Sequence, residues 1–327
     1  MSGPVARPVI LLSNRFAPVL DAALRAQYEA IGPLGKPLAG SVAALPAAQR
    51  AEIRALVTLG TTPVGQDVID LLPALGAIVC MGSGYERVDL AAARARGIVV
   101  AHSPGANAAS VADLAIGLMI ASVRGMFRAN AYLQRGDWSR RVKRQLGGPG
   151  LTGRRIGIYG LGAIGAKIAV RAAAMEMEVG YCNRRRRDDV PYAYFPTLPA
   201  LAAWSDVLMI AVRADDTNRH AVDADVLHAL GPGGHVVNIA RGSVIGEAAL
   251  VAALESGGIA GAGLDVFETE PDVPEALLNH PGVALTPHIG GDTEDAAAAM
   301  AAMVMANLEA YFAGCDVPHP VPAGQEG

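Results

Sequence analysis

Residues 155–165 read Arg155-Ile156-Gly157-Ile158-Tyr159-Gly160-Leu161-Gly162-Ala163-Ile164-Gly165, and this stretch decides the fold. A β-type run, Arg155–Tyr159, leads directly into a GxGxxG spacing that opens a helical segment. The first glycine permits a tight turn, the second lets the backbone approach a pyrophosphate, and the third lets the helix lie against the strand. The helix N-terminus attracts negative charge. A ligand-free glycine turn is the alternative, but this context predicts a dinucleotide-binding unit whose cofactor contacts run from Gly160 to Gly165.

The end of the next expected strand, Glu178–Cys182, indicates which dinucleotide is bound. NAD-binding folds place an acidic residue there, roughly 20 residues after the turn, to bond the ribose 2′-hydroxyl. This chain has Asn183 followed by four arginines, residues 184–187. Guanidinium groups form charge-assisted bonds with a 2′-phosphate that a carboxylate would repel. Asn183, Arg184 and Arg185 are therefore predicted to favour NADPH over NADH, with a solvated charge run as the alternative.

The rest of the chain repeats the alternation of strands and helices on both sides of this unit. Its 327 residues exceed the roughly 250 to 300 at which one core stops growing, so we expect two domains. Both show the pattern of a doubly wound parallel sheet of the α/β class. Ser103-Pro104-Gly105 separates them, and a long helix over Ala108–Met126 follows. The expected strands are Val9–Ser13, Ala55–Leu59, Ala77–Met81 and Ile98–Ala101, then Arg155–Tyr159, Glu178–Cys182, Asp206–Val212, His235–Ile239, Gly261–Leu264 and Val283–Leu285. The expected helices include Val19–Ala30, Val88–Arg96 and Thr293–Phe312.

Charge and cysteine content limit the partners. The formal net charge of −4 argues against a general nucleic-acid or membrane-surface binder. Three widely spaced cysteines, Cys80, Cys182 and Cys315, indicate neither a disulfide framework nor a metal site, and they fit a reducing cytoplasm. No metal ligand set is expected, since the histidines lack metal-ligand spacing.

Three later segments place polar residues where parallel sheets bind ligands, at the ends of strands: 238–242, 265–271 and 286–291. Carbonyl reduction needs a cation for the substrate carboxylate, a proton donor for the keto oxygen and a group that orients this donor. Arg241, His288 and Glu270 can fill these roles.

Taken together, these motifs resemble the D-isomer-specific 2-hydroxyacid dehydrogenases, and most closely the glyoxylate/hydroxypyruvate and hydroxyphenylpyruvate reductases. The resemblance covers nearly the whole chain. The segments that carry it are Met81-Gly82-Ser83-Gly84-Tyr85, Val111-Ala112-Asp113-Leu114-Ala115, the glycine turn, Asn238–Gly242, Gly263–Pro271 and Pro287–Gly291.

The resemblance implies a flavodoxin-like substrate domain, residues 1–102 plus 289–327, and a Rossmann cofactor domain, residues 103–288, with the active site in a cleft between them. Arg241 would bind the 2-oxo acid, His288 would be the general acid, and Glu270 would hold the other imidazole nitrogen. The family's carboxylate-binding loop matches Ser83 and Gly84. The remaining cofactor contacts implied are Thr217, Ile239, Ala240, Asp265 and Gly290, although a buried capping role for Asp265 is the competing interpretation.

The chain departs from the family pattern at His102, where Asn is frequent, at Gly246 and at Arg213, none of them in the proposed triad. The resemblance also implies a homodimer formed near Trp138, for which a local core anchor is the alternative. The predicted function is NADPH-dependent reduction of a small 2-oxo acid to a D-2-hydroxy acid. A redox-sensing regulatory protein on the same fold is the alternative from another class, and an NAD-linked oxidation of formate or phosphite is a minor third.

Overall fold

The computed structural model describes residues 7–141 and 147–322. The chain divides into two compact units. Unit 1 comprises Met1–Asn107 with Asp292–Gly327, and unit 2 comprises Ala108–Gly291. These junctions lie a few residues beyond the boundaries expected from the sequence, because residues 103–107 and the turn after His288 stay with the strands that precede them.

Unit 1 is built on a five-stranded parallel sheet with the order β2-β1-β3-β4-β5. Its strands are β1 (Val9–Leu12), β2 (Glu29–Ile31), β3 (Ile53–Leu59), β4 (Ala77–Met81) and β5 (Val99–Ala101). This is the order of flavodoxin-like sheets, which bind ligands at the carboxyl ends of their strands. The expected parallel α/β fold is therefore confirmed for this unit.

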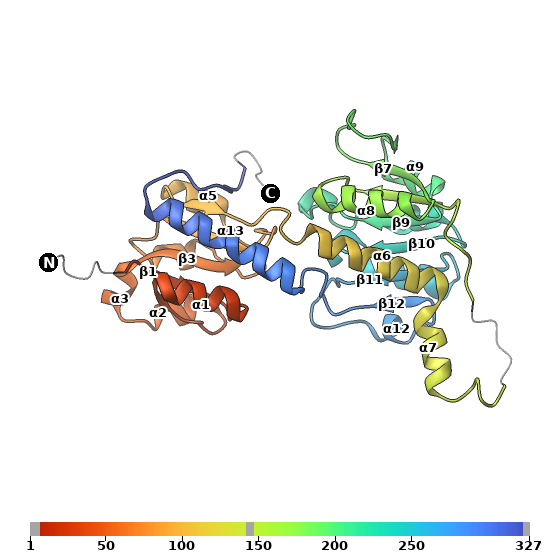
Figure 1. Cartoon of the computed structure of the whole chain (residues 1–327), viewed down its shortest axis with the longest axis horizontal. Coiled ribbons are helices and arrows are strands. Elements are labelled where there is room, and N and C mark those ends of the chain that lie inside the picture. Colours follow the sequence, from red (N-terminus) through yellow and green to blue (C-terminus); the bar gives the residue numbers. More distant parts are fainter. Residues whose placement is uncertain (1–6, 142–146, 323–327) are drawn as a thin grey trace. The chain divides into compact units, whose positions relative to one another are not determined.

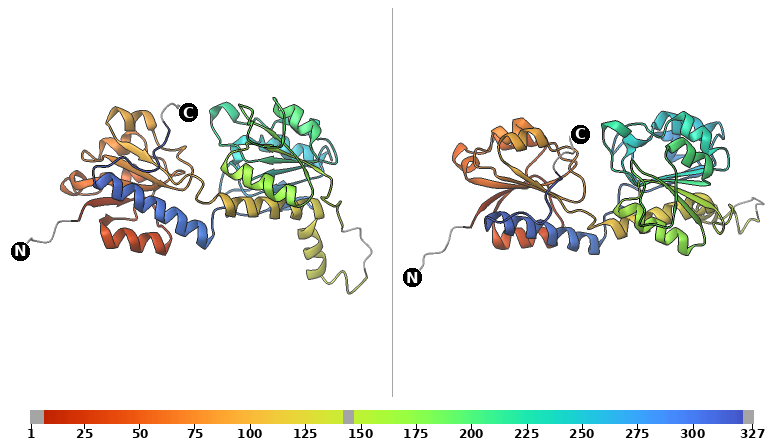
Figure 2. Two further views of the ribbon diagram at one scale, coloured as in Figure 1. Left: turned by 45° about the horizontal axis from the view of Figure 1, so that its top comes forward. Right: turned by 90° about the horizontal axis from the view of Figure 1, so that it is seen from above.

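Helices cover both faces of the unit 1 sheet, as the second view in Figure 2 shows. The helices are α1 (Pro18–Gln27), α2 (Leu38–Ala43), α3 (Ala47–Glu52), α4 (Gln66–Asp70), α5 (Leu90–Ala95) and the C-terminal α13 (Glu294–Phe312). Helix α13 lies beside α1 and packs on β4 through Ala301, Val304 and Leu308 (Figure 1). Residues almost 300 positions apart in sequence therefore share one core.

Unit 2 contains a seven-stranded parallel sheet with the order β12-β11-β10-β9-β6-β7-β8. Its strands are β6 (Arg155–Tyr159), β7 (Glu178–Cys182), β8 (Ala193–Tyr194), β9 (Val207–Ile210), β10 (His235–Asn238), β11 (Gly261–Leu264) and β12 (Val283–Leu285). The winding direction reverses between β6 and β9, which is where doubly wound sheets bind their ligand. The doubly wound sheet expected for this unit is confirmed.

The helices of unit 2 form two layers. Helices α6 (Ala108–Arg124) and α8 (Ala163–Ala174) share one core cluster with the sheet. The opposite cluster includes α9 (Leu198–Trp204), α10 (Ala224–Leu230), α11 (Glu247–Glu255) and α12 (Glu275–Leu278). Short 3-10 turns, η1 (Asp216–Asn218) and η2 (Gly242–Val244), follow β9 and β10. Helix α7 (Met126–Gln134) extends away from the sheet in Figures 1 and 2.

Two expected helices end earlier than the sequence pattern suggested. Helix α1 stops at Gln27, and Glu29–Ile31 instead forms β2 by pairing with β1, so tertiary pairing overrides a segment with little β propensity. The long helix expected to reach Met126 ends at Arg124, because Gly125 adopts a left-handed conformation with φ of 62°. The two-residue strand β8 had no sequence signal.

No single helix within the described residues is long and apolar enough to cross a membrane. Helices α6 and α7 pass that test only as a pair, and they are bent by 66° at their junction.

His235 at the start of β10 is a buried histidine with an internal partner. Its side chain is 5% exposed, and Nδ1 lies 2.9 Å from Oγ of Ser122 on α6. Burial, with a smaller effect of the Arg154 charge, lowers the pKa of His235 from 6.5 to about 4. The folded unit therefore favours the neutral ring, while the unfolded chain already binds a proton near pH 6.5.

We expect this histidine to make unit 2 sensitive to acid. Because the folded pKa is the lower one, its contribution is complete above pH 6.5 and is lost as the pH falls towards 4. The free energy of unfolding should drop by about 2 kcal/mol between pH 7 and pH 5 on this account. Urea unfolding of His235→Asn should show a smaller drop, whereas the exposed-histidine control His228→Asn should behave as wild type. Equal drops in all three proteins would contradict this assignment.

Candidate active site

The glycine turn at the end of β6 has the geometry that its spacing predicts. Gly160 has φ of +100°, and a Cβ there would lie 2.5 Å from the Val212 nitrogen. A Cβ on Gly165 would lie 2.0 Å from the Gly160 carbonyl oxygen, so this glycine permits close packing of α8 on β6. Gly162, the residue before α8, has no atom within 4 Å of an added Cβ, so open space adjoins the unpaired N–H groups of the helix start. The turn thus offers an accessible anion-binding cradle.

Asn183 and the arginine run lie at the end of β7, directly beside this turn. Asn183 Oδ1 accepts a hydrogen bond from the Leu161 N–H at 2.7 Å. Arg187 is committed to structure, since it donates to the Leu161 carbonyl at 2.9 Å and pairs with Asp189. Arg186 pairs with Asp188 at 3.4 Å.

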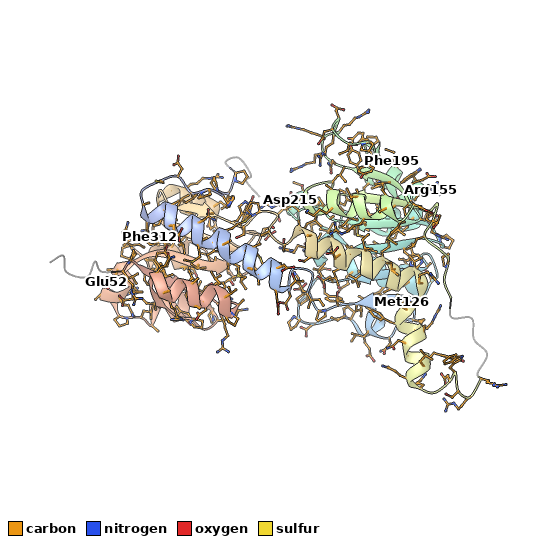
Figure 3. The ribbon with its side chains drawn as sticks, in the orientation of Figure 1. Glu52, Met126, Arg155, Phe195, Asp215 and Phe312 are labelled. Carbon is orange, nitrogen blue, oxygen red and sulfur yellow. The ribbon has the colours of Figure 1, made fainter. Side chains whose placement is uncertain are left out.

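Arg184 and Arg185, by contrast, are exposed and make no hydrogen bond or ion pair within residues 7–141 and 147–322. The structure therefore leaves two of the four arginines available for an external anion. Asp215, the N-cap residue of η1 (labelled in Figure 3), interacts electrostatically with Arg184. Hydrogen bonding from Thr217 lowers the pKa of the Asp215 carboxyl, and the charges of Arg184 and Arg213 lower it further.

Three of the predicted cofactor contacts use their polar groups inside the protein. Thr217 donates its hydroxyl and its N–H to Asp215 Oδ1, at 2.5 and 3.0 Å. The Ile239 N–H donates to the Ile210 carbonyl, and the Ala240 N–H donates to Asn238 Oδ1. The donor groups of these three residues are therefore already used within the protein.

Arg241 follows β10 on a turn that is held by its neighbours. Buried Asn238 donates through Nδ2 to the Arg241 carbonyl at 2.9 Å, and the Arg241 Nη1 donates to the Ala240 carbonyl at 2.7 Å. A Cβ on Gly242 would lie 1.9 Å from the carbonyl carbon of Phe267. The Arg241 turn therefore contacts the backbone of the segment that carries Glu270, and only glycine permits this approach.

Glu270 and His288 form a direct pair. The imidazole Nδ1 of His288 lies 2.7 Å from Oε2 of Glu270, and the other carboxylate oxygen accepts the Phe267 N–H at 3.1 Å. Because a carboxylate only accepts, His288 carries its proton on Nδ1 when it is neutral, and Nε2 is left to face a ligand. Both side chains are a little over one-third exposed, 37% and 36%, so the pair is open to solvent or substrate.

Asp265 holds the loop on which His288 sits. Its buried carboxylate accepts hydrogen bonds from the Thr286 hydroxyl at 2.6 Å and from the N–H groups of Ile289 and Gly290 at 2.9 and 2.8 Å. His288 itself has φ of 54°, which is rare for a residue with a side chain and persists only where the surroundings impose it. These bonds supply the capping role that was the competing interpretation of Asp265.

The residues after β9, β10, β11 and β12 lie at the same edge of the unit 2 sheet as the glycine turn, because the carboxyl ends of parallel strands meet there. A second charged cluster supports this edge. Glu268 accepts hydrogen bonds from His220 Nε2 at 2.7 Å and Arg219 at 2.6 Å, and the bond from His220 lowers the pKa of the Glu268 carboxyl. Ser83 and Gly84 lie in unit 1, after β4.

Sequence reasoning missed the groups that hold these functional residues in place. Asn238, Thr286 and Glu268 act through hydrogen bonds to backbone or to neighbouring loops. In the sequence, Asn238 stands out only as part of the 238–242 segment, and His220 belongs to no motif. No periodicity or spacing identifies such contacts, since the partners come from different strands.

Comparisons with known proteins agree with this geometry. Residues 116–290 match the family model described as D-isomer specific 2-hydroxyacid dehydrogenase, NAD binding domain. The chain is 38% identical to hydroxyphenylpyruvate reductase of Plectranthus scutellarioides over 84% of its length and 87% of that protein. It is 40% identical to 2-ketogluconate reductase of Gluconobacter oxydans, over 82% and 86%. The crystal structure of NADPH-dependent glyoxylate/hydroxypyruvate reductase from Sinorhizobium meliloti, in complex with NADP and malonate, has a TM-score of 0.89 and 38% identity, covering 97% of each chain.

Proposed function

The chain belongs to the D-isomer specific 2-hydroxyacid dehydrogenase family, and from this membership we propose that it uses NADPH to reduce a small 2-oxo acid to the D-2-hydroxy acid. The similar proteins are reductases of hydroxyphenylpyruvate, 2-ketogluconate and glyoxylate or hydroxypyruvate. The observation that carries the proposal is the His288–Glu270 pair, 2.7 Å apart, at the same sheet edge as an open glycine turn.

The residues of unit 2 fit a phosphorylated dinucleotide. The open space at Gly162 admits a pyrophosphate next to the start of α8. Arg184 and Arg185 are the available cations for the 2′-phosphate, because Arg186 and Arg187 are already paired. Asp265 would bond the nicotinamide amide, and Thr217, Gly290 and the backbone of Ile239 and Ala240 would line the cofactor. When bound, NADPH supplies the hydride that the reaction requires.

The remaining groups handle the substrate and its proton. Arg241 binds the carboxylate and keto group through its planar guanidinium, which matches two oxygens at once. His288 donates the proton on Nε2 to the keto oxygen and ends as the neutral ring with its proton on Nδ1. Glu270 keeps that Nδ1 proton in place and orients the ring. In unit 1, the Ser83-Gly84 turn supplies backbone N–H groups to the carboxylate.

A direct assay tests the function. When glyoxylate, hydroxypyruvate, 2-oxogluconate or an arylpyruvate is added to the purified protein with NADPH, the absorbance of the reduced nicotinamide should fall. The panel also identifies the preferred substrate, which the pocket sets. Binding of NADPH without turnover on any 2-oxo acid would instead support the redox-sensing alternative, which the reductase relatives do not favour.

We also propose the functional assignment of the two units and their environment. Unit 1 is the substrate domain and unit 2 the cofactor domain, as the expected split architecture requires. The three cysteines are free, two of them buried and Cys315 exposed, which fits a reducing cytoplasm.

A homodimer through helix α7 is the proposed assembly. Met126, Phe127 and Leu133 on this helix are 53%, 49% and 52% exposed, and Trp138 after it is 71% exposed (Figure 3 labels Met126). The exposure of Trp138 contradicts the alternative that it anchors a local core. Large apolar side chains gathered on one projecting helix indicate a protein interface.

We expect Phe127→Glu combined with Leu133→Glu to convert a dimer into a monomer, because each change places a charge in an apolar contact. Light scattering coupled to gel filtration measures the mass. The matched control is Val170→Glu on α8, a valine outside α7 that is more exposed, at 63%. A wild-type monomer, or a double variant that remains dimeric, would contradict the assignment.

A further inference from the structure

The turn after β4 in unit 1 presents two backbone donors without partners. Within the described residues, neither the N–H of Ser83 nor that of Gly84 donates a hydrogen bond. Gly82, with φ of +105°, starts the turn, and both following residues are partly exposed. Consecutive unpaired N–H groups form an anion-binding concavity of the kind that receives carboxylates.

Each of these N–H groups belongs to a peptide group whose carbonyl oxygen, on the opposite side, accepts a hydrogen bond. In a planar trans peptide, the C=O and the following N–H point in opposite directions. The Gly82 carbonyl accepts the Ser103 N–H at 2.8 Å, which fixes the plane of the Ser83 N–H. The Ser83 carbonyl lies 3.0 Å from His102 Nδ1, which fixes the plane of the Gly84 N–H. Residues 102 and 103 therefore orient both donors.

His102 is itself held in place. Its backbone N–H donates to the His319 carbonyl at 3.0 Å, and its backbone carbonyl accepts a hydrogen bond from the side chain of buried Asn307 of α13 at 3.2 Å. Its ring meets Tyr85 edge-on, with centroids 5.2 Å apart and planes at 87°. Since a carbonyl can only accept, His102 Nδ1 carries a proton and is the donor to Ser83.

We propose that His102 is a positioning residue for substrate binding: its Nδ1–H holds the Ser83 carbonyl so that the Gly84 N–H points at the substrate carboxylate. This inference rests on the proposed function for the identity of the ligand. A donor on the carbonyl also polarises the peptide and strengthens the N–H at its other end. An Asn at residue 102 would keep a donor at the same bond distance from the backbone, because Asn Nδ2 and His Nδ1 are both attached to Cγ.

Two substitutions separate hydrogen bonding from simple space filling. His102→Leu fills the site without a donor, while His102→Asn restores a donor at the Nδ1 position. The matched control is His319→Ala in the same unit, because the contacts of His319 with His102 and Asn307 use only backbone atoms. For each protein, the measurements are Kd of malonate with NADP+ present, KM and kcat for glyoxylate and hydroxypyruvate, Kd of NADPH, and the thermal midpoint.

We expect His102→Leu to raise Kd of malonate and KM of the 2-oxo acid on the order of tenfold, with kcat and the NADPH Kd nearly unchanged. His102→Asn should restore both values to within about threefold of wild type, and His319→Ala should match wild type. A thermal change without the KM effect, equal losses in the Leu and Asn variants, or no malonate binding by wild type would each overturn the inference. Turnover by wild type tests the proposed function separately, since malonate binding does not require it.

Discussion

Replacing His288 by Asn should lower kcat for 2-oxo acid reduction on the order of 10²-fold or more. The amide N–H is too weakly acidic to transfer a proton to the keto oxygen, so the reaction loses its general acid. Asn is also the least disruptive replacement at this position. Its Nδ2 can still donate to Glu270, as His288 Nδ1 does over 2.7 Å, and Asn tolerates the left-handed backbone with φ of 54°. The loss should therefore report chemistry rather than folding.

Stopped-flow or steady-state kinetics with saturating NADPH measure this effect. Kd of NADPH and the thermal midpoint should stay near the wild-type values, because Asp265 holds the loop through Thr286, Ile289 and Gly290 without using the imidazole. His228→Asn, at an exposed position of α10, controls for loss of a histidine elsewhere in unit 2. Turnover by His288→Asn within a few-fold of wild type would remove this residue as the proton donor.

The second large effect concerns the cofactor. Arg184→Asp should lower the preference for NADPH over NADH, as the ratio of their kcat/KM values, on the order of 10²-fold. A charge-assisted hydrogen bond to the 2′-phosphate disappears, and the introduced carboxylate repels the phosphate while offering an acceptor to a free 2′-hydroxyl. Asp215 lies within the field of Arg184, so the substitution also leaves two carboxylates at this edge.

Arg186→Asp provides the matched control, since it makes the same change of charge two residues away. Arg186 is 71% exposed and already pairs with Asp188, so its replacement should change the NADPH preference by less than about threefold. Arg187 is unsuitable as a control because it holds the glycine turn through the Leu161 carbonyl. An unchanged preference in Arg184→Asp, or equal changes in both variants, would show that the arginine run is only a solvated loop.

The assignment of His288 as the proton donor and the assignment of Arg184 to NADPH selection are tested independently. If His288→Asn is active while Arg184→Asp switches the cofactor, the glycine turn and arginine run keep their roles and the proton donor must be sought elsewhere at the sheet edge. If the cofactor preference is unchanged while His288→Asn is inactive, the Glu270–His288 pair remains the reacting centre and only the NADPH selection is lost.

The sequence by itself determined the sheet class and the edge of the sheet at which the candidate site residues lie. The glycine spacing after β6 requires the tight turn, the open helix start and the close helix packing that Gly160, Gly162 and Gly165 show. The order of the later motifs places Arg241, Glu270 and His288 after neighbouring parallel strands, and hence at one edge. Both features depend on local spacing and on the order of motifs along the chain, so a single sequence is enough to predict them.

The tertiary structure decided which groups remain available and which are already used. Only the folded chain shows that Arg187 donates to Leu161, that Arg184 makes no hydrogen bond or ion pair within the described part of the chain, and that Asp265 binds the His288 loop. The pairing of strand β2 with β1 and the hydrogen bond from His102 to the Ser83 carbonyl likewise depend on residues that are distant in sequence and meet in the fold. Hydrogen bonds and burial join residues far apart in sequence, and their energies depend on distance in space, which residue spacing along the chain does not encode.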